Sequence, residues 1–220
     1  MKRSFNLDIV LERIESAIAP YPKAAMFDLY EQGYTSLFEQ LVACIISIRT
    51  LDETSLPLSQ QLFAVARTPQ QLLKLSPKEI EDLLYGSTFP GQKANTILGI
   101  ARAAVEQYGG ELPADFHQLI ALKGVGPKCA NLALGVATGS AGISVDIHVH
   151  RITNRWGYVH TAQPEQTMVA LEEKVPTERW IDINRLLVPF GKHICTGRAP
   201  HCSTCPVLEY CRQVGVTTHR

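Results

Sequence analysis

The stretch LKGVGPKCAN at residues 122–131 joins two segments, 115–122 and 128–137, through a connection that contains two glycines. Two helices joined by so tight a Gly-x-Gly turn form a helical hairpin. The turn therefore predicts a helix-hairpin-helix element in the middle of the chain. The same signal is weak on its own, because any tight connection between helices can use glycine.

The hairpin also has the features of an anion site. Glycines let a backbone approach a ligand closely, and the N–H groups of Gly124, Val125 and Gly126 adjoin the start of the following helix. We expect this turn to bind a DNA phosphate without reading base sequence.

Lys128 lies in the first turn of the helix that follows, where the positive end of the helix dipole favours a neutral amine. Such a lysine can be a nucleophile, or it can be an ordinary phosphate-binding or solvated lysine. Asp146 also allows a purely structural interpretation, because it can cap the helix expected to follow it.

The segment around Asp146 allows one other interpretation. Ile143, Val145, Ile147 and Val149 alternate as in a strand, and a strand would place Asp146, His148 and His150 on one metal-binding face. We favour a helix from Asp146, since the chain has no second strand for this one to pair with.

The rest of the chain has helical patterns. Helices are predicted near residues 7–18, 94–108, 165–175 and 177–188, and Thr68-Pro69 opens a short one. Three capping boxes, each a Ser or Thr with Glu three residues later, predict helix starts at Ser36, Thr50 and Ser76. The fold class is therefore all-α.

Four cysteines near the C-terminus, Cys195, Cys202, Cys205 and Cys211, have the spacing C-x6-C-x2-C-x5-C. A compact loop with four thiolates suits a [4Fe-4S] cluster, in which each iron takes one cysteine. Zinc is the main alternative, but structural zinc sites usually have two paired knuckles and this loop has one close pair. Cys44 and Cys129 lie in apolar helical stretches and are predicted to be core residues.

Composition limits the classes of function only partly. The 21 basic and 21 acidic residues give a formal net charge of zero, so any nucleic-acid binding must come from local sites. The first residues do not have the pattern of a signal peptide, and no apolar run reaches the roughly 18 residues of a membrane helix. We expect a cytoplasmic protein, nucleoid-associated if bacterial, that has no membrane partner and is monomeric.

Taken together, the motif at 122–131, the sequence VDIH at 145–148 and the four-cysteine loop resemble the endonuclease III family, from about Ser36 to Cys211. The resemblance implies a two-lobed helix-hairpin-helix DNA glycosylase fold. Its six-helix barrel lobe corresponds to residues 28–140, and its second helical lobe, with the iron–sulfur cluster, corresponds to residues 1–27 and 141–220. The partner implied is double-stranded DNA that contains oxidised bases or abasic sites.

The resemblance also assigns chemistry. Lys128 is expected to attack the sugar C1′ of a flipped nucleotide and to form a Schiff base, with Asp146 as its catalytic partner. β-Elimination then cuts the strand. The implied activity is a bifunctional glycosylase and abasic-site lyase that removes oxidised pyrimidines.

The sequence departs from the family pattern in three places. Arg49 stands where the family has a glutamine opposite the flipped nucleotide, and Phe89 stands where it has a leucine wedge. The cluster loop has Arg198 where the family often has several basic residues. We expect Arg49, Phe89 and Arg198, together with Lys93 and His148, to contact DNA, while the lesion range and opposite-base preference stay open.

Two other functions fit the same sequence features. One is a glycosylase with little lyase activity, although relatives of that kind generally lack the Schiff-base lysine. The other is a non-catalytic DNA-binding or redox-sensing module that uses the same iron–sulfur scaffold.

Overall fold

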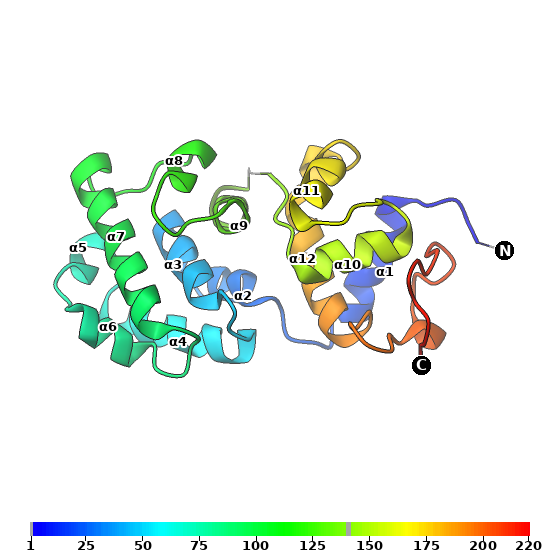
Figure 1. Ribbon diagram of the computed structural model, residues 1–220, viewed down its shortest axis with the longest axis horizontal. Coiled ribbons are helices and arrows are strands. Elements are labelled where there is room, and N and C mark those ends of the chain that lie inside the picture. The colour runs from blue at the N-terminus through cyan, green and yellow to red at the C-terminus, as the bar shows by residue number, and fades with distance from the viewer. Residues whose placement is uncertain (1, 140–141) are drawn as a thin grey trace. The chain divides into compact units, whose positions relative to one another are not determined.

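The computed structural model describes residues 2–139 and 142–220, and every regular element in these ranges is a helix. The all-α prediction is therefore confirmed. The chain divides into two compact units, one of residues 25–141 and one of residues 1–24 with 142–220. In Figure 1 the colours show that the second unit combines both ends of the chain.

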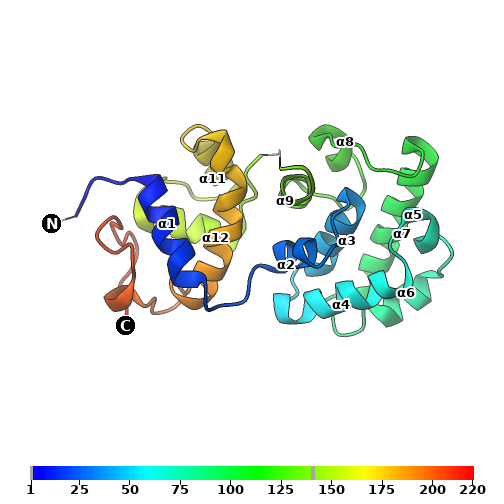
Figure 2. The same ribbon diagram turned by 180° about the vertical axis from the view of Figure 1, so that it is seen from behind.

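The unit of residues 25–141 is built around one buried helix. Its elements are α2 (Ala25–Glu31), α3 (Leu37–Ser47), α4 (Asp52–Val65), α5 (Pro69–Leu72), α6 (Pro77–Leu83), α7 (Pro90–Tyr108), α8 (Phe116–Ile120) and α9 (Pro127–Thr138). Nine of the eleven residues of α3 are buried, as expected for a helix that is apolar nearly all round. Helix α3 packs against α9, α4 and α7, and Figures 1 and 2 show it between α7 and α9.

Side-chain caps explain several of the helix starts in this unit. Ser36 and Ser76 form capping boxes with Glu39 and Glu79, as predicted. The predicted box at Thr50 is wrong, because α4 begins at Asp52 with Leu51 as its N-cap and has no side-chain cap. The Thr50 hydroxyl is instead bonded to Thr88 and Lys93, which come from a distant part of the sequence.

The second unit packs helices from both ends of the chain around a common core. Its elements are α1 (Leu7–Ile18), α10 (Ile147–Trp156), α11 (Pro164–Glu172), the 3-10 turn η1 (Thr177–Arg179), α12 (Trp180–His193) and the 3-10 turn η2 (Cys202–Thr204). Helix α12 contacts both α1 and α10. Val10 of α1, Trp156 of α10, Leu171 of α11 and Phe190 of α12 all lie in this core.

Several boundaries differ from the predictions. Helix α7 begins at Pro90, four residues before the predicted start, because Pro90 occupies its first position. The predicted helix 177–188 is a 3-10 turn followed by α12, which continues to His193. A helix does follow Asp146, so the strand alternative, with its metal-binding face, is wrong.

None of the helices within residues 2–139 and 142–220 combines the length and the apolarity required to cross a membrane.

Candidate active site and metal centre

The hairpin turn lies between α8 and α9, and its geometry requires glycine at one position. The Val125 N–H donates to the Leu122 carbonyl at 3.0 Å, which closes the turn. Gly124 has φ +89°, and a Cβ there would lie 2.8 Å from Thr96 Cγ2. Both the backbone conformation and the close approach of α7 therefore exclude a larger residue at Gly124.

The second glycine is constrained differently. Gly126 is the N-cap of α9 in an extended conformation, and a Cβ there would meet nothing within 4 Å. Gly124 and Gly126 are both exposed, whereas the Val125 side chain is buried and anchors the turn. The turn thus presents its backbone, together with the N-terminus of a twelve-residue helix, to solvent.

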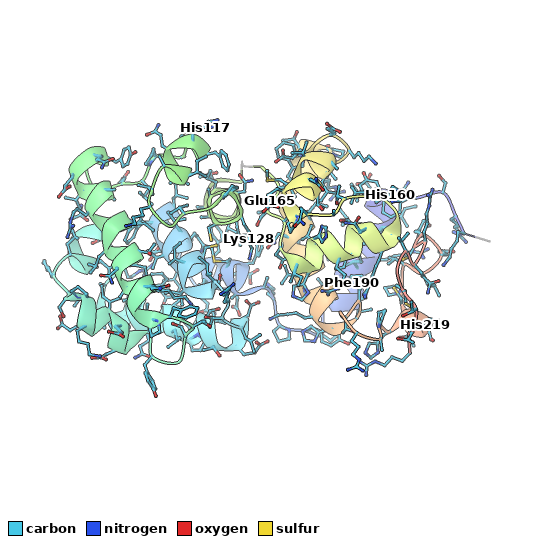
Figure 3. The ribbon with its side chains drawn as sticks, in the orientation of Figure 1. His117, Lys128, His160, Glu165, Phe190 and His219 are labelled. Carbon is cyan, nitrogen blue, oxygen red and sulfur yellow. The ribbon has the colours of Figure 1, made fainter. Side chains whose placement is uncertain are left out.

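Lys128 is the second residue of α9, and it is exposed. Its neighbour Cys129 is buried and faces Cys44 of α3, with the two sulfur atoms 2.7 Å apart. Cys44 and Cys129 are therefore core residues, as predicted. The packing of α9 on α3 fixes the helix start from which the Lys128 side chain projects (Figure 3).

Asp146 belongs to the other unit and caps α10. Its Oδ1 atom accepts hydrogen bonds from the His148 and Val149 N–H groups, both at 2.9 Å. Because both bonds use Oδ1, the cap orients the carboxylate without using Oδ2. The side chain is half-buried, so it combines a fixed position with access to solvent.

His148 follows in the first turn of α10 and is half-buried against α12. Its ring nitrogen Nδ1 lies 3.1 Å from Nη2 of Arg151, and a Cβ on Gly191 would lie 2.6 Å from Nδ1. Burial lowers the pKa of His148, and the nearby Asp146 carboxylate opposes that shift. The glycine at 191 is what gives the imidazole room beside α12.

The four C-terminal cysteines line one small cavity. Cys195 follows α12, Cys202 begins η2, and Cys205 and Cys211 lie in the turns after it. The other lining residues include the apolar side chains of Trp156, Phe190, Ile194, Leu208 and Val216. Within residues 2–139 and 142–220, no three Cys, His, Asp or Glu side chains are placed to hold a single metal ion.

Backbone and side-chain N–H groups point at the cysteine sulfurs. The Gln213 N–H donates to Cys211 Sγ at 3.3 Å, and Arg155 Nη1 lies 3.5 Å from Cys195 Sγ. Burial raises the pKa of the Cys205 thiol to about 12. An uncoordinated Cys205 would stay protonated at neutral pH, whereas a thiolate there needs a positive group inside the cavity.

Two arginines of α10 tie this helix to the cysteine loop. Arg155 donates to the Thr196 and Gly197 carbonyls at 2.6 and 2.7 Å. Arg151 donates to the Cys195 carbonyl at 3.0 Å and to the Gly191 carbonyl at 2.9 Å. The sequence predictions did not include these residues, although their i, i+4 spacing on the helix that Asp146 caps was a visible signal.

The remaining predicted DNA contacts fall into two groups. Arg49, Phe89 and Arg198 are exposed, and Phe89 retains 56% of its accessible surface although it is aromatic. Lys93 differs, because it is only 6% exposed. Its Nζ atom donates to the Ile46 carbonyl at 2.6 Å and to Thr50 Oγ1 at 2.7 Å, so its charge points into the unit.

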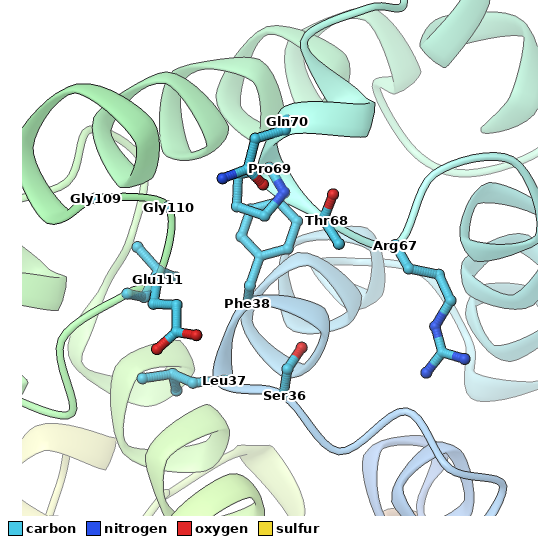
Figure 4. A pocket seen from close by; sticks show the side chains of 11 residues that line it. Ser36, Leu37, Phe38, Arg67, Thr68, Pro69, Gln70, Gly109, Gly110 and Glu111 are labelled. Atoms are coloured by element: carbon cyan, nitrogen blue, oxygen red, sulfur yellow. The ribbon is translucent and has the colours of Figure 1, made fainter.

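A separate hollow in the unit of residues 25–141 contains none of the predicted site residues. It lies between the start of α3, the Arg67–Gln70 segment and the Gly109–Leu112 loop (Figure 4). Arg67 on its edge is paired with the buried Glu39 carboxylate at 2.6 Å. The hollow is thus bordered by a charge that stabilises the fold.

Comparison with known proteins gives consistent matches. Residues 42–177 match the model of the HhH-GPD superfamily of base excision DNA repair proteins. The chain is 42% identical over 177 residues to endonuclease III of Thermotoga maritima, covering 80% of this chain and 83% of the relative. It is 33% identical over 181 residues to endonuclease III of Escherichia coli K12, covering 82% and 86%.

A solved structure gives the same result. The chain is similar to a trapped covalent intermediate of endonuclease III with DNA, an estranged-adenine complex, with a TM-score of 0.81 and 27% identity over 94% of each chain. A non-covalent endonuclease III–DNA complex follows, with a TM-score of 0.76, 26% identity and coverage of 92% and 95%.

Proposed function

The chain belongs to the endonuclease III family of base excision DNA repair proteins, and from this membership we propose that it excises oxidised pyrimidines from duplex DNA and cleaves the strand at the resulting abasic site. The single observation that carries the lyase part is an exposed lysine in the first turn of the hairpin's second helix. The second group is the Asp146 carboxylate, which caps α10 through Oδ1 and leaves Oδ2 unused by the cap.

Lys128 supplies the nucleophile in this proposal. Its neutral Nζ attacks the sugar C1′, a C–N bond forms, and the glycosidic bond breaks so that the base leaves with its electron pair and takes up a proton. The ring then opens to a protonated Schiff base. Loss of a C2′ proton breaks the C3′–O bond and expels the 3′ phosphate, and water finally releases the sugar from the lysine.

Asp146 supplies negative charge at the reacting centre. Its carboxylate stabilises the positive charge that develops on the sugar as the base departs. The two N–H bonds to Oδ1 restrain the carboxylate before the substrate arrives, so little reorganisation is needed during the reaction. Asp146 belongs to the unit of residues 1–24 and 142–220, whereas Lys128 belongs to the unit of residues 25–141.

DNA binding is assigned to exposed backbone and side chains. The Gly124–Gly126 turn and the first turn of α9 offer N–H groups to a phosphate. Phe89 is proposed to fill the gap that a flipped nucleotide leaves, and Arg49 to contact the unpaired base. The five N–H donors of an arginine suit the O6 and N7 acceptors of guanine. Arg198 and His148 are proposed to add contacts from the second unit.

The four cysteines are proposed to hold a [4Fe-4S] cluster. The fit rests on four thiols that line one small cavity and on N–H donors aimed at two of the sulfurs. When bound, the cluster supplies positive charge that stabilises the four thiolates and links three short loops. The loop that carries Arg198 then has a fixed place relative to α10 through Arg155.

Borohydride trapping on DNA with an abasic site tests the proposed activity. The wild type is expected to give a covalent protein–DNA adduct, and Lys128→Ala none, with unchanged circular dichroism. The neighbouring exposed Lys123 provides a matched control, since Lys123→Ala should still be trapped. Asp146→Asn keeps the cap but loses the charge, so base excision should fall about 100-fold or more.

The same assay separates the alternatives. A wild type that excises bases without being trapped is a glycosylase with little lyase activity. A wild type that binds lesion DNA but does neither is a non-catalytic module. Undiminished trapping of Lys128→Ala assigns the nucleophile to another amine.

A further inference from the structure

Arg49 and Phe89 share an unusual backbone conformation. Arg49 follows α3 and has φ +54°, and Phe89 precedes α7 and also has φ +54°. This left-handed region is disfavoured for residues with a side chain, so it persists only where the surroundings hold it. Both side chains are exposed, and burial of the side chains themselves therefore does not supply the restraint.

A set of hydrogen bonds joins the two segments directly. The Thr88 hydroxyl donates to the Arg49 carbonyl at 2.6 Å. Thr88 also donates its backbone N–H to Thr50 Oγ1 at 3.2 Å. Each left-handed residue is thus next to a threonine that is bonded to the opposite segment.

Lys93 closes this set from inside the unit. From the first turn of α7, its Nζ reaches the last turn of α3 at the Ile46 carbonyl and also donates to Thr50 Oγ1. Burial lowers the pKa of Lys93 to about 8, as expected for an amine held away from water. The ammonium therefore bonds to the protein at the place where the sequence suggested a DNA contact.

We propose that Lys93, Thr50 and Thr88 form a polar clasp, and that they are positioning residues which present Arg49 and Phe89 together to the DNA. The clasp has a function distinct from general stability. It joins the two segments whose residues carry a guanidinium and an aromatic ring before DNA is bound. Preorganised contacts cost less ordering entropy on binding, so duplex recognition gains from the clasp. This inference rests on the proposed function for its DNA role.

The two DNA substrates of the test separate positioning from stability. A duplex lesion requires a wedge and a contact to the unpaired base, whereas a lesion in single-stranded DNA requires neither. The variants are Lys93→Met, which keeps the apolar stem but removes the donors, and Thr88→Val, which removes one hydroxyl. Lys74→Met is the matched control, because Lys74 is exposed in the same unit.

Single-turnover excision of an oxidised pyrimidine is measured in both substrates and opposite each base. In both variants, excision from duplex DNA is expected to fall about tenfold or more, which is the range of one good base contact. The differences in excision rate between the four opposite bases should also disappear. On single-stranded DNA, excision and borohydride trapping should both stay within about twofold of wild type, because this substrate requires neither the wedge nor the contact to the unpaired base. An equal loss on both substrates, or no loss on either, overturns the clasp.

Amide hydrogen exchange supplies a readout that does not depend on activity. Residues 47–52 and 86–90 should exchange faster in Lys93→Met and Thr88→Val than in wild type, with α9 unchanged. Unchanged exchange in both segments overturns the clasp even if the wild type is inactive. Failure of the wild type to excise or be trapped counts against the proposed function instead, so the two failures are distinguishable.

Discussion

Lys93 and Arg49 are basic residues of the same unit, yet only Arg49 presents its charge to solvent. The difference comes from their partners, because Lys93 donates to two oxygen atoms inside the unit. For a basic residue in either segment, residue type and position in the sequence are compatible with a solvent-exposed charge and with a buried one. Depth of burial therefore decides whether a lysine near a candidate DNA surface can reach a phosphate.

Burial of Lys93 predicts a pH dependence of stability. Its pKa is lowered from 10.5 to about 8 in the folded chain, so between these values the unfolded chain binds more protons. The penalty for the buried charge is complete below pH 8 and is relieved as pH rises toward 10.5. Relative to Lys93→Met, the wild type should gain up to about 3 kcal/mol in free energy of unfolding across this window.

Chemical denaturation at pH 7.5, 8.5, 9.5 and 10.5 measures this difference. The wild type and Lys74→Met are the control pair, because Lys74 is exposed. The difference between their free energies of unfolding should stay constant across these pH values. A flat difference for Lys93→Met as well would mean that the folded chain binds the Lys93 proton as tightly as the unfolded chain does.

At the scale of elements, the structure confirms predictions based on local contacts. The caps at Ser36, Ser76 and Asp146 join residues two or three positions apart, so sequence alone contains both partners. The box at Thr50 was wrong because its hydroxyl has partners 38 and 43 positions away. Long-range bonds of this kind leave no periodic signal in the sequence.

The two hairpin glycines should respond differently to the same substitution. Gly124→Ala combines a positive φ with a contact of 2.8 Å to Thr96, so it should lower the free energy of unfolding by about 1–3 kcal/mol. Gly126→Ala has open space and an ordinary φ, so its effect should be within about 0.5–1 kcal/mol. Thermal or urea unfolding measures both.

For DNA affinity, Gly126 is the glycine whose substitution we expect to matter. If the Gly126 backbone approaches a phosphate, Gly126→Ala should weaken binding to abasic-site DNA although the protein remains stable. Equal affinity of Gly126→Ala and wild type would remove Gly126 from the DNA contacts.

At the scale of the whole molecule, the fold class and the motifs of the candidate site were visible in the sequence. The hydrogen bonds that join the helix capped by Asp146 to the cysteine loop were not. The motif at 122–131 and the cysteine spacing are continuous stretches, so the sequence displays them directly. The arginines that join α10 to the cysteine loop act across 40 or more positions. Only the fold shows that the helix capped by Asp146 also contacts two of the four cysteines, Cys195 and Cys211.

Loss of the proposed cluster should therefore affect one unit selectively. Cys202→Ala is expected to lose the broad visible absorbance and the iron, about four per chain in the wild type. Amide exchange should quicken in residues 195–214 and at the end of α10, where the carbonyls of Arg155 and Trp156 accept bonds from that loop. Helices α3 and α9 should keep their protection.

Cys44→Ala is the matched control, since Cys44 is a buried cysteine of the other unit and should leave absorbance and iron unchanged. Purified protein with stoichiometric zinc and no sulfide, made with ample iron and without oxygen, would contradict the cluster assignment.

The discontinuous unit also has a consequence for biosynthesis. Helix α1 packs on α12, so the nascent α1 lacks this partner until the ribosome has made Trp180–His193. At about 5–20 residues per second, that wait is on the order of ten seconds or more. All of the continuous unit of residues 25–141 is made during this time. The apolar face of α1, with Val10, Leu11 and Ile14, therefore stays exposed during this time and is prone to aggregation until α12 covers it.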